Sequence, residues 1–132
     1  MRAVDTNVIV RLLTADDRRQ SEAAKTLFAS GPIWIAKTVL LETAWVLESV
    51  YGFKPVDVQD ALAKLLGLAN VNMEDQAAVA AALALARKGL DFANAMHLVA
   101  GRPPGAAFVS FDQSFIRRAA RAGIGDIAVI HR

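Results

Sequence analysis

Short apolar runs alternate with longer amphipathic stretches along the whole chain. Between the runs, apolar residues recur at three- and four-residue spacing, which is the repeat of a helix with one buried face. The apolar runs fit five strands, at 2–5, 33–36, 70–73, 106–111 and 127–130, of which 70–73 is the weakest. Strands alternating with helices predict a three-layer α/β/α fold with a central parallel sheet of about five strands. No repeat or linker interrupts the pattern, so we expect a single domain over residues 1–132.

Local signals mark where the helices begin and end. Asp16 and Asp17 precede one helical stretch, Pro55 suits a first helical position, and Gly89 ends an alanine-rich helix. The stretch from Val39 to Tyr51 is apolar on nearly every side. A helix of that kind is either buried or part of an interface with a partner. Hydrophobic residues make up 55% of the chain, which also indicates apolar surface for an oligomer or another partner.

Acidic residues lie at the ends of these predicted elements. Asp5 and Asp112 follow strands, whereas Glu42 and Asp91 lie near the starts of helices. Right-handed connections gather the carboxyl ends of parallel strands along one edge of the sheet, where ligands bind. We therefore expect the four acids to converge there. For Asp5, Asp91 and Asp112, simple N-capping of the following helix is the alternative. Other acids, including Asp16 and Asp17, fit solvated or capping positions.

Converging carboxylates repel one another unless a cation neutralises them. The chain has no cysteine and two histidines, so an oxygen-ligated Mg²⁺ or Mn²⁺ suits its composition best. Two such ions, about 3.5–4 Å apart, can hold the attacking water and the leaving oxygen of a phosphodiester.

The charge and the hydropathy of the chain set further bounds. A formal net charge of +2 permits nucleic-acid binding without requiring it. Arg117, Arg118 and Arg121 cluster near the C-terminus, where a solvated helix face is the simplest interpretation unless the cluster borders the acids. No signal peptide precedes the first strand, and the longest apolar run, at 77–86, is too short to span a membrane. We expect a cytoplasmic protein that does not enter the membrane.

Four short motifs together resemble a known family. They are Val4-Asp5-Thr6-Asn7, Leu41-Glu42, the segment from Asp91 to Leu98, and Ser110-Phe111-Asp112. In order and placement they resemble the successive motifs of PIN-domain ribonucleases, and their spacing resembles the VapC toxins of bacterial toxin–antitoxin pairs. The resemblance covers essentially the whole chain. It implies a Mg²⁺- or Mn²⁺-dependent endoribonuclease that cuts RNA, forms a homodimer and is silenced by a cognate antitoxin.

The resemblance also implies roles for individual residues. Asp5 would be the central metal ligand, Glu42 and Asp91 would share ligation or orient the water, and Asp112 would complete a second metal site. Hydrogen-bonding support around the ligands would come from Thr6, Asn7 and Ser110. RNA phosphates would meet Arg117, Arg118 and Arg121.

One position departs from the family pattern. The third acid of the family usually stands directly before the residue that is Ala95 in this chain, and that position is Asn94. Asp91, one helical turn earlier, is the nearest carboxylate. Either Asp91 or Asn94 would then be the third metal ligand.

Two other functions remain open at this point. A phosphatase with an aspartyl nucleophile on the first strand normally has a second Asp two residues later, where this chain has Asn7. A PIN-like module that binds RNA or a partner without cutting is the non-enzymatic alternative, and the presence of Asn94 favours it.

Overall fold

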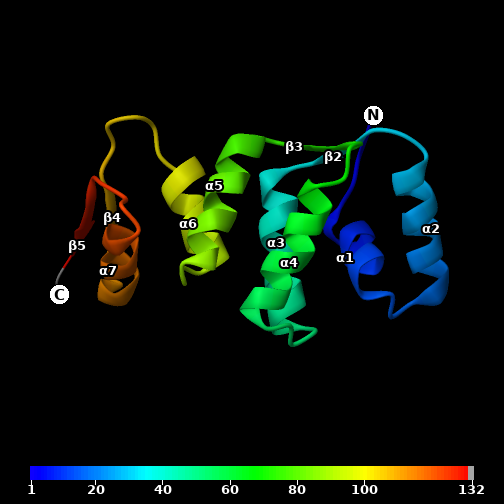
Figure 1. Cartoon of the computed structure of the whole chain (residues 1–132), viewed down its shortest axis with the longest axis horizontal. Coiled ribbons are helices and arrows are strands. Elements are labelled where there is room, and N and C mark those ends of the chain that lie inside the picture. Colours follow the sequence, from blue (N-terminus) through cyan, green and yellow to red (C-terminus); the bar gives the residue numbers. More distant parts are fainter. Residues whose placement is uncertain (131–132) are drawn as a thin grey trace. The chain divides into compact units, whose positions relative to one another are not determined.

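The computed structural model of the chain describes residues 1–130, so His131 and Arg132 lie outside the described residues. The chain forms two compact units, residues 1–76 and 77–132, and each unit is described by itself. Helices and short parallel strands alternate along both units (Figure 1). Among residues 1–130, no helix is long and apolar enough to cross a lipid bilayer.

The first unit is built around a parallel sheet of three strands in the order β1-β2-β3. Arg2 of β1 pairs with Ile33 of β2, and Ile33 pairs in turn with Val71 of β3. The elements are β1 (Arg2–Ala3), α1 (Thr6–Thr14), α2 (Arg18–Ala29), β2 (Ile33–Ile35), α3 (Lys37–Ser49), α4 (Pro55–Leu66) and β3 (Val71–Met73).

The helix that carries Glu42 is capped by a residue that directly follows β3. Ala36, at the N-cap of α3, has no side chain that can cap. Instead, the backbone N–H of Lys37 donates to the carboxylate of Glu74 at 2.9 Å, and Glu74 is held because its own N–H donates to the carbonyl of Ile35. This capping explains why α3 begins at Lys37, two residues before the predicted start at Val39.

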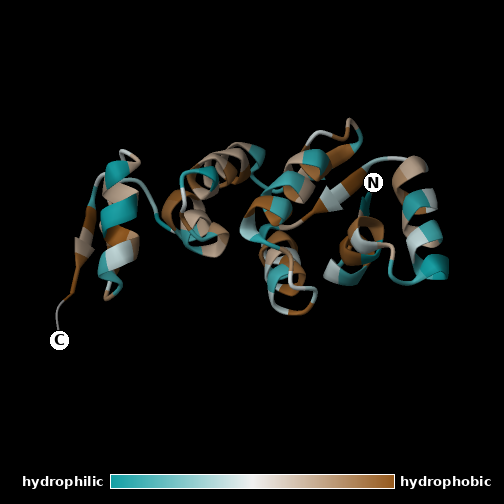
Figure 2. Ribbon diagram, turned by 60° about the horizontal axis from the view of Figure 1, so that its bottom comes forward, coloured by the Kyte–Doolittle hydropathy of each residue, from teal (hydrophilic) through white to brown (hydrophobic). Residues whose placement is uncertain are grey.

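The core of the first unit lies between its helices and its sheet. Ile33 and Ile35 of β2 are buried, and Figure 2 shows that hydrophobic and hydrophilic residues alternate along the helices. The helices contribute fully buried side chains to this core: Ile9, Val10, Leu40, Leu47, Val58, Leu62 and Leu65. Helix α1 contacts both α2 and α3, so the first turn of α1 is fixed from two sides.

The second unit contains most of α5 and a separate parallel pair of strands. Phe108 of β4 pairs with Ile127 of β5, and the ring of Phe108 packs edge-on against Phe115 with ring centroids 5.7 Å apart. Arg102 ties the loops together, because its guanidinium donates to the carbonyls of Asp126 at 2.7 Å and Gly125 at 3.0 Å. The elements are α5 (Gln76–Arg87), α6 (Phe92–Ala100), β4 (Phe108–Ser110), α7 (Gln113–Arg121) and β5 (Ile127–Val129).

The strand pairing confirms part of the expected fold and corrects another part. The α/β class, the parallel pairing and all five predicted strand segments are confirmed. The prediction of one central sheet of about five strands is wrong, because the sheet of the first unit has three strands, and β4 and β5 form a two-stranded sheet of their own among the described residues. Apolar runs indicate which segments are strands, but they do not indicate which strand each one pairs with.

Candidate active site

Asp5 lies directly after β1 and forms the N-cap of α1. Its backbone is extended, with φ −93° and ψ 177°, and its Oδ1 accepts a hydrogen bond from the N–H of Val8 at 3.1 Å. The carboxylate is exposed, and the cap uses only one of its two oxygens. Asp5 can therefore cap the helix and still offer an oxygen to a cation.

Thr6 holds Glu42 next to Asp5. Thr6 is the first residue of α1 and is buried, with 7% of its surface exposed. Its hydroxyl donates to Oε1 of Glu42, which projects from α3. Glu42 itself is exposed, so this hydrogen bond restricts a side chain that would otherwise sample several rotamers.

Asp5 and Glu42 face a common hollow, which we call the acidic hollow. It has a volume of about 260 Å³ and is lined by Asp5, Thr6, Asn7, Glu42 and Val46. Two carboxylates, an amide and a hydroxyl are the oxygen donors that Mg²⁺ and Mn²⁺ prefer. Within each unit, the described residues contain no group of three or more Asp, Glu or His side chains that could hold one ion. The donors of the acidic hollow fit an ion that keeps several waters, as Mg²⁺ usually does.

The remaining predicted ligands belong to the second unit. Asp91 forms the N-cap of α6, and its Oδ2 accepts a hydrogen bond from the N–H of Asn94 at 3.2 Å. Asp112 forms the N-cap of α7, and its own N–H donates to the hydroxyl oxygen of Ser110 at 3.0 Å. Asp91 and Asn94 thus share one helical turn, and Ser110 and Asp112 are joined by a hydrogen bond. The convergence of the four acids stays a prediction.

The capping alternative is confirmed as a geometric fact for Asp5, Asp91 and Asp112. Each uses one carboxylate oxygen for its cap, so capping and metal ligation do not exclude each other. Asp17 caps α2 in the same way, accepting from the N–H of Gln20 at 3.0 Å, and it lines neither the acidic hollow nor the pocket beside it. Capping alone therefore does not identify a ligand.

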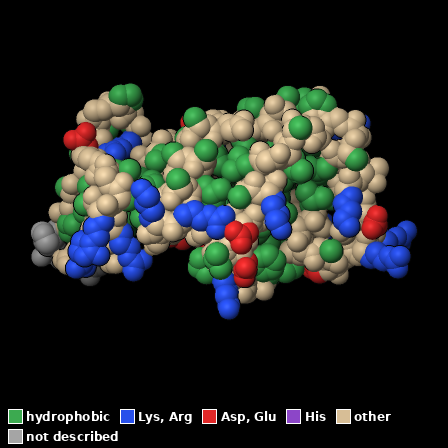
Figure 3. Space-filling view, in the orientation of Figure 1, with side chains coloured by type: hydrophobic (Ala, Val, Ile, Leu, Met, Phe, Trp, Pro, Cys, Tyr) green, Lys and Arg blue, Asp and Glu red, His purple; other side chains and the backbone are tan. Residues whose placement is uncertain are grey.

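The predicted arginine cluster lies on α7. Phe115, Ile116 and Ala119 form the buried face of this helix. The three arginines of the cluster are exposed on its other side, and Figure 3 shows Lys and Arg side chains gathered over the end of the second unit that carries α7. Arg118 is also anchored, since its Nη1 donates to the carbonyl of Gly89 at 3.1 Å, two residues before Asp91. Arg118 therefore contacts the segment that leads to Asp91 within the same unit.

A polar network beside the first site was not predicted from the sequence. Arg11 donates through Nη1 to Oδ1 of Asp16 at 2.8 Å and to the hydroxyl of Tyr51 at 3.1 Å, and Tyr51 donates to Oδ2 of Asp16 at 2.7 Å. The hydrogen bonds from Tyr51 and Arg11 lower the pKa of Asp16 from 3.8 to about 2, and the bond to Asp16 raises the pKa of Arg11. No spacing rule links Asp16 to Tyr51, which lies 35 residues away, so sequence reasoning placed Asp16 among the solvated or capping acids.

Comparison with known proteins identifies the family. The PIN domain family model matches residues 2–121, a range that includes both compact units almost entirely. The chain belongs to the PIN domain family. PIN domains are generally nucleases that bind RNA, and they usually use divalent metal ions. No curated protein sequence matches the chain.

Proposed function

We propose that this PIN domain is an endoribonuclease that depends on Mg²⁺ or Mn²⁺. The observation that carries the proposal is the acidic hollow, in which Thr6 holds the carboxylate of Glu42 beside the exposed carboxylate of Asp5. Two carboxylates that line one hollow repel each other unless a cation neutralises them. A cation turns that repulsion into attraction.

Each residue of the proposed site would have its own task. Asp5 and Glu42 would hold the ion from the first unit, and Asn7 would hydrogen-bond nearby. From the second unit, further ligands would be Asp91, Asn94 and Asp112, with Ser110 positioning Asp112. When bound, the ion would lower the pKa of a water molecule and neutralise the charge of the phosphodiester. The exposed arginines would contact RNA phosphates, which makes binding weaker at high salt.

The nuclease proposal is tested with purified protein and a labelled RNA. Cleavage should require Mg²⁺ or Mn²⁺ and should stop when EDTA is added. Glu42→Gln should reduce cleavage strongly because it removes one metal-binding charge. Glu22→Gln, an exposed position on α2, is the matched control and should cleave like wild type. Cleavage that survives chelation would contradict the proposal.

We further propose that the nuclease is the VapC-type toxin of a toxin–antitoxin pair. This proposal rests on the motif order and on exposed apolar surface that a partner would cover. In the first unit, Trp45 is 63% exposed, Val50 is 65% exposed and Val56 is 51% exposed. We propose that α3, through Trp45, forms a homodimer contact and that a cognate antitoxin covers further apolar surface.

The partner proposals have separate tests. Trp45→Glu should shift the protein from dimer to monomer in light scattering, whereas a wild-type monomer at high micromolar concentration would contradict the dimer. Expression of the protein alone should arrest growth, and coexpression with the product of a neighbouring small reading frame should restore it. High-level expression without any growth defect would contradict the toxin role.

The presence of Asn94 favours one second candidate function, in which the PIN domain binds RNA without cutting it. An amide oxygen ligates a cation without contributing charge, so Asn94 weakens the attraction of the site for a metal compared with an aspartate. Saturable RNA binding with no cleavage at any Mn²⁺ concentration would favour this candidate.

A further inference from the structure

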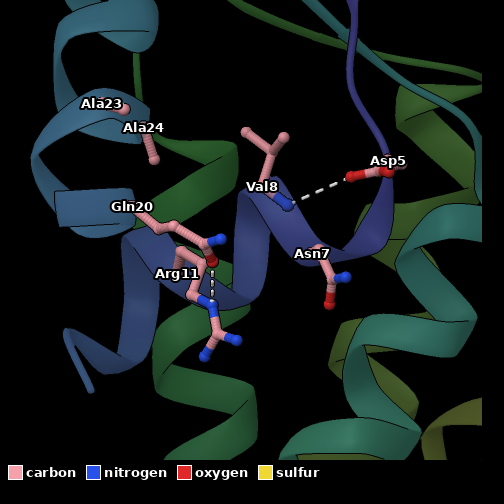
Figure 4. A pocket seen from close by; sticks show the side chains of 7 residues that line it. All are labelled: Asp5, Asn7, Val8, Arg11, Gln20, Ala23 and Ala24. Atoms are coloured by element: carbon pink, nitrogen blue, oxygen red, sulfur yellow. Dashed lines mark hydrogen bonds between the residues drawn. The ribbon is translucent and has the colours of Figure 1, made fainter. Parts of the chain in front are cut away.

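A second hollow adjoins the acidic hollow, between helices α1 and α2. It has a volume of about 300 Å³ and shares Asp5 and Asn7 with the acidic hollow. Its other lining residues are Val8, Arg11, Gln20, Ala23 and Ala24. We call it the helix pocket, and Figure 4 shows it from close by. An RNA strand bound at Asp5 would lie beside the helix pocket, because Asp5 lines both hollows.

Arg11 decides how Gln20 presents its amide group. The Nε of Arg11 donates to Oε1 of Gln20 at 2.6 Å, the contact drawn in Figure 4. A guanidinium has only hydrogen-bond donors, so the Gln20 amide must point its oxygen, and not its nitrogen, toward Arg11. The amide nitrogen of Gln20 is then turned away from Arg11. Because Asp16 and Tyr51 hold Arg11 in turn, Gln20 is a fixed hydrogen-bond donor.

The remaining walls of the helix pocket suit a flat aromatic group. Val8, Ala23 and Ala24 are small and apolar, and they leave room between the helices. A volume of about 300 Å³ is at the lower end of the range for small-ligand pockets, which is enough for one nucleobase. A base gains from apolar contact on its faces and from a hydrogen bond at its edge.

We propose that the helix pocket holds one nucleobase of the RNA strand next to the cleaved bond, and that Gln20 selects bases that carry a carbonyl oxygen. This inference rests on the proposed ribonuclease function. Uracil, cytosine and guanine each offer an exocyclic carbonyl oxygen to the amide donor, whereas adenine has no exocyclic oxygen and offers only ring nitrogens as acceptors. Adenine is therefore the disfavoured base.

The first test measures binding without cleavage. Fluorescence anisotropy in EDTA compares short oligouridine and oligoadenosine with wild type, Gln20→Glu and Gln76→Glu. Gln20→Glu keeps the contact to Arg11 but replaces the donor by an acceptor, so the uridine-to-adenosine affinity ratio should fall by about fivefold or more. Gln76→Glu makes the same change in the first turn of α5, outside the helix pocket, and should keep the wild-type ratio.

The second test fills the pocket and reads the cut sites. Ala23→Leu places a larger side chain on the α2 wall, and its cleavage of a random RNA should lose the bias against adenine at one fixed position beside the cut. Circular dichroism checks that both variants fold. If either variant does not fold, the other carries the test, because both change the same pocket.

The outcomes separate the pocket from the nuclease. Base-dependent binding that Gln20→Glu abolishes, in a protein that cuts nothing, would support the pocket and contradict the nuclease. If the folded variants cleave RNA with an unchanged base preference, the proposal of base selection by the helix pocket is wrong. The ribonuclease proposal is then unaffected. A wild-type protein that binds no RNA would overturn both.

Discussion

Thr6 and Glu42 are 36 residues apart in the sequence, and a hydrogen bond from the Thr6 hydroxyl to the Glu42 carboxylate joins them. The bond connects the first turn of α1 to α3 and so fixes the second carboxylate of the acidic hollow relative to the first. Thr6 is buried, whereas Asp5 and Glu42 are exposed. The hydroxyl thus acts from inside the fold on a group that faces solvent.

Removal of the Thr6 hydroxyl should loosen Glu42. Thr6→Val keeps the shape of the side chain but cannot donate, so Mn²⁺ affinity should fall by about 10–100-fold, the usual effect of removing a partner of a metal ligand. Calorimetric Mn²⁺ titration measures the change. Thr6→Ser, which keeps the donor, should stay close to wild type, and equal losses in both variants would show that Thr6 acts only through packing.

Asp91 and Asn94 should respond differently to the exchange of carboxylate and amide. Asp91→Asn should keep the α6 cap, because Asn caps as well as Asp. It should nevertheless weaken Mn²⁺ binding by roughly tenfold, since a charged contact is lost. Asn94→Asp should change little. Unchanged Mn²⁺ binding in Asp91→Asn, together with a clear gain in Asn94→Asp, would assign the third ligand position to residue 94.

The Arg11–Asp16–Tyr51 network predicts an acid-sensitive contribution to stability. The pKa of Asp16 is lowered from 3.8 to about 2 in the folded protein, so its ionised form favours folding. The contribution is complete above pH 3.8 and is lost as the pH falls toward about 2. The melting temperature of wild type should fall more steeply over this range than that of Asp16→Asn. Parallel curves of melting temperature against pH for the two proteins would contradict this contribution to stability. Solvent screening keeps the contribution small.

Ser21 should be replaceable with a gain in stability. It is only 2% exposed, and its hydroxyl has no hydrogen-bond partner among the residues that the structure describes. Ser21→Ala should raise the free energy of unfolding by about 1 kcal/mol, measured by urea denaturation, because it removes a buried unsatisfied group. Ser49→Ala, at an exposed position of α3, shares the gain in helix propensity and is the control. An equal gain at both positions would attribute the effect to propensity alone.

Local signals in the sequence predicted what depends on a few neighbouring residues. The caps formed by Asp5, Asp91 and Asp112 each involve a backbone N–H three residues later, and the pattern of acids before apolar stretches indicated all three. The strand segments were predicted for the same reason, since each is a compact apolar run. Glu42 was expected at the site because it lies near the start of a helix, and the structure gives it a partner in Thr6.

Contacts between distant segments were not predictable in this way. Glu74 caps α3 from 37 residues away, and Tyr51 joins Arg11 from 40 residues away. The pairing of β4 with β5, which overturned the expected five-stranded sheet, is also a choice between distant segments. The pattern of a single sequence indicates that a segment is buried, but it does not indicate which other segment it contacts. The fixed orientation of Gln20 belongs to the same group, because it depends on Arg11.

In the proposed site, the Asp5 carboxylate binds a catalytic metal ion in addition to capping the first turn of α1. Asp17 provides a matched control, because it caps α2 through the same contact to a backbone N–H. Asp5→Asn and Asp17→Asn should both fold, since the amide keeps each cap. The decisive measurement is the single-turnover rate of RNA cleavage in Mn²⁺ for wild type and the two variants. We predict that Asp5→Asn abolishes cleavage while Asp17→Asn retains it, and full activity in Asp5→Asn would contradict the account.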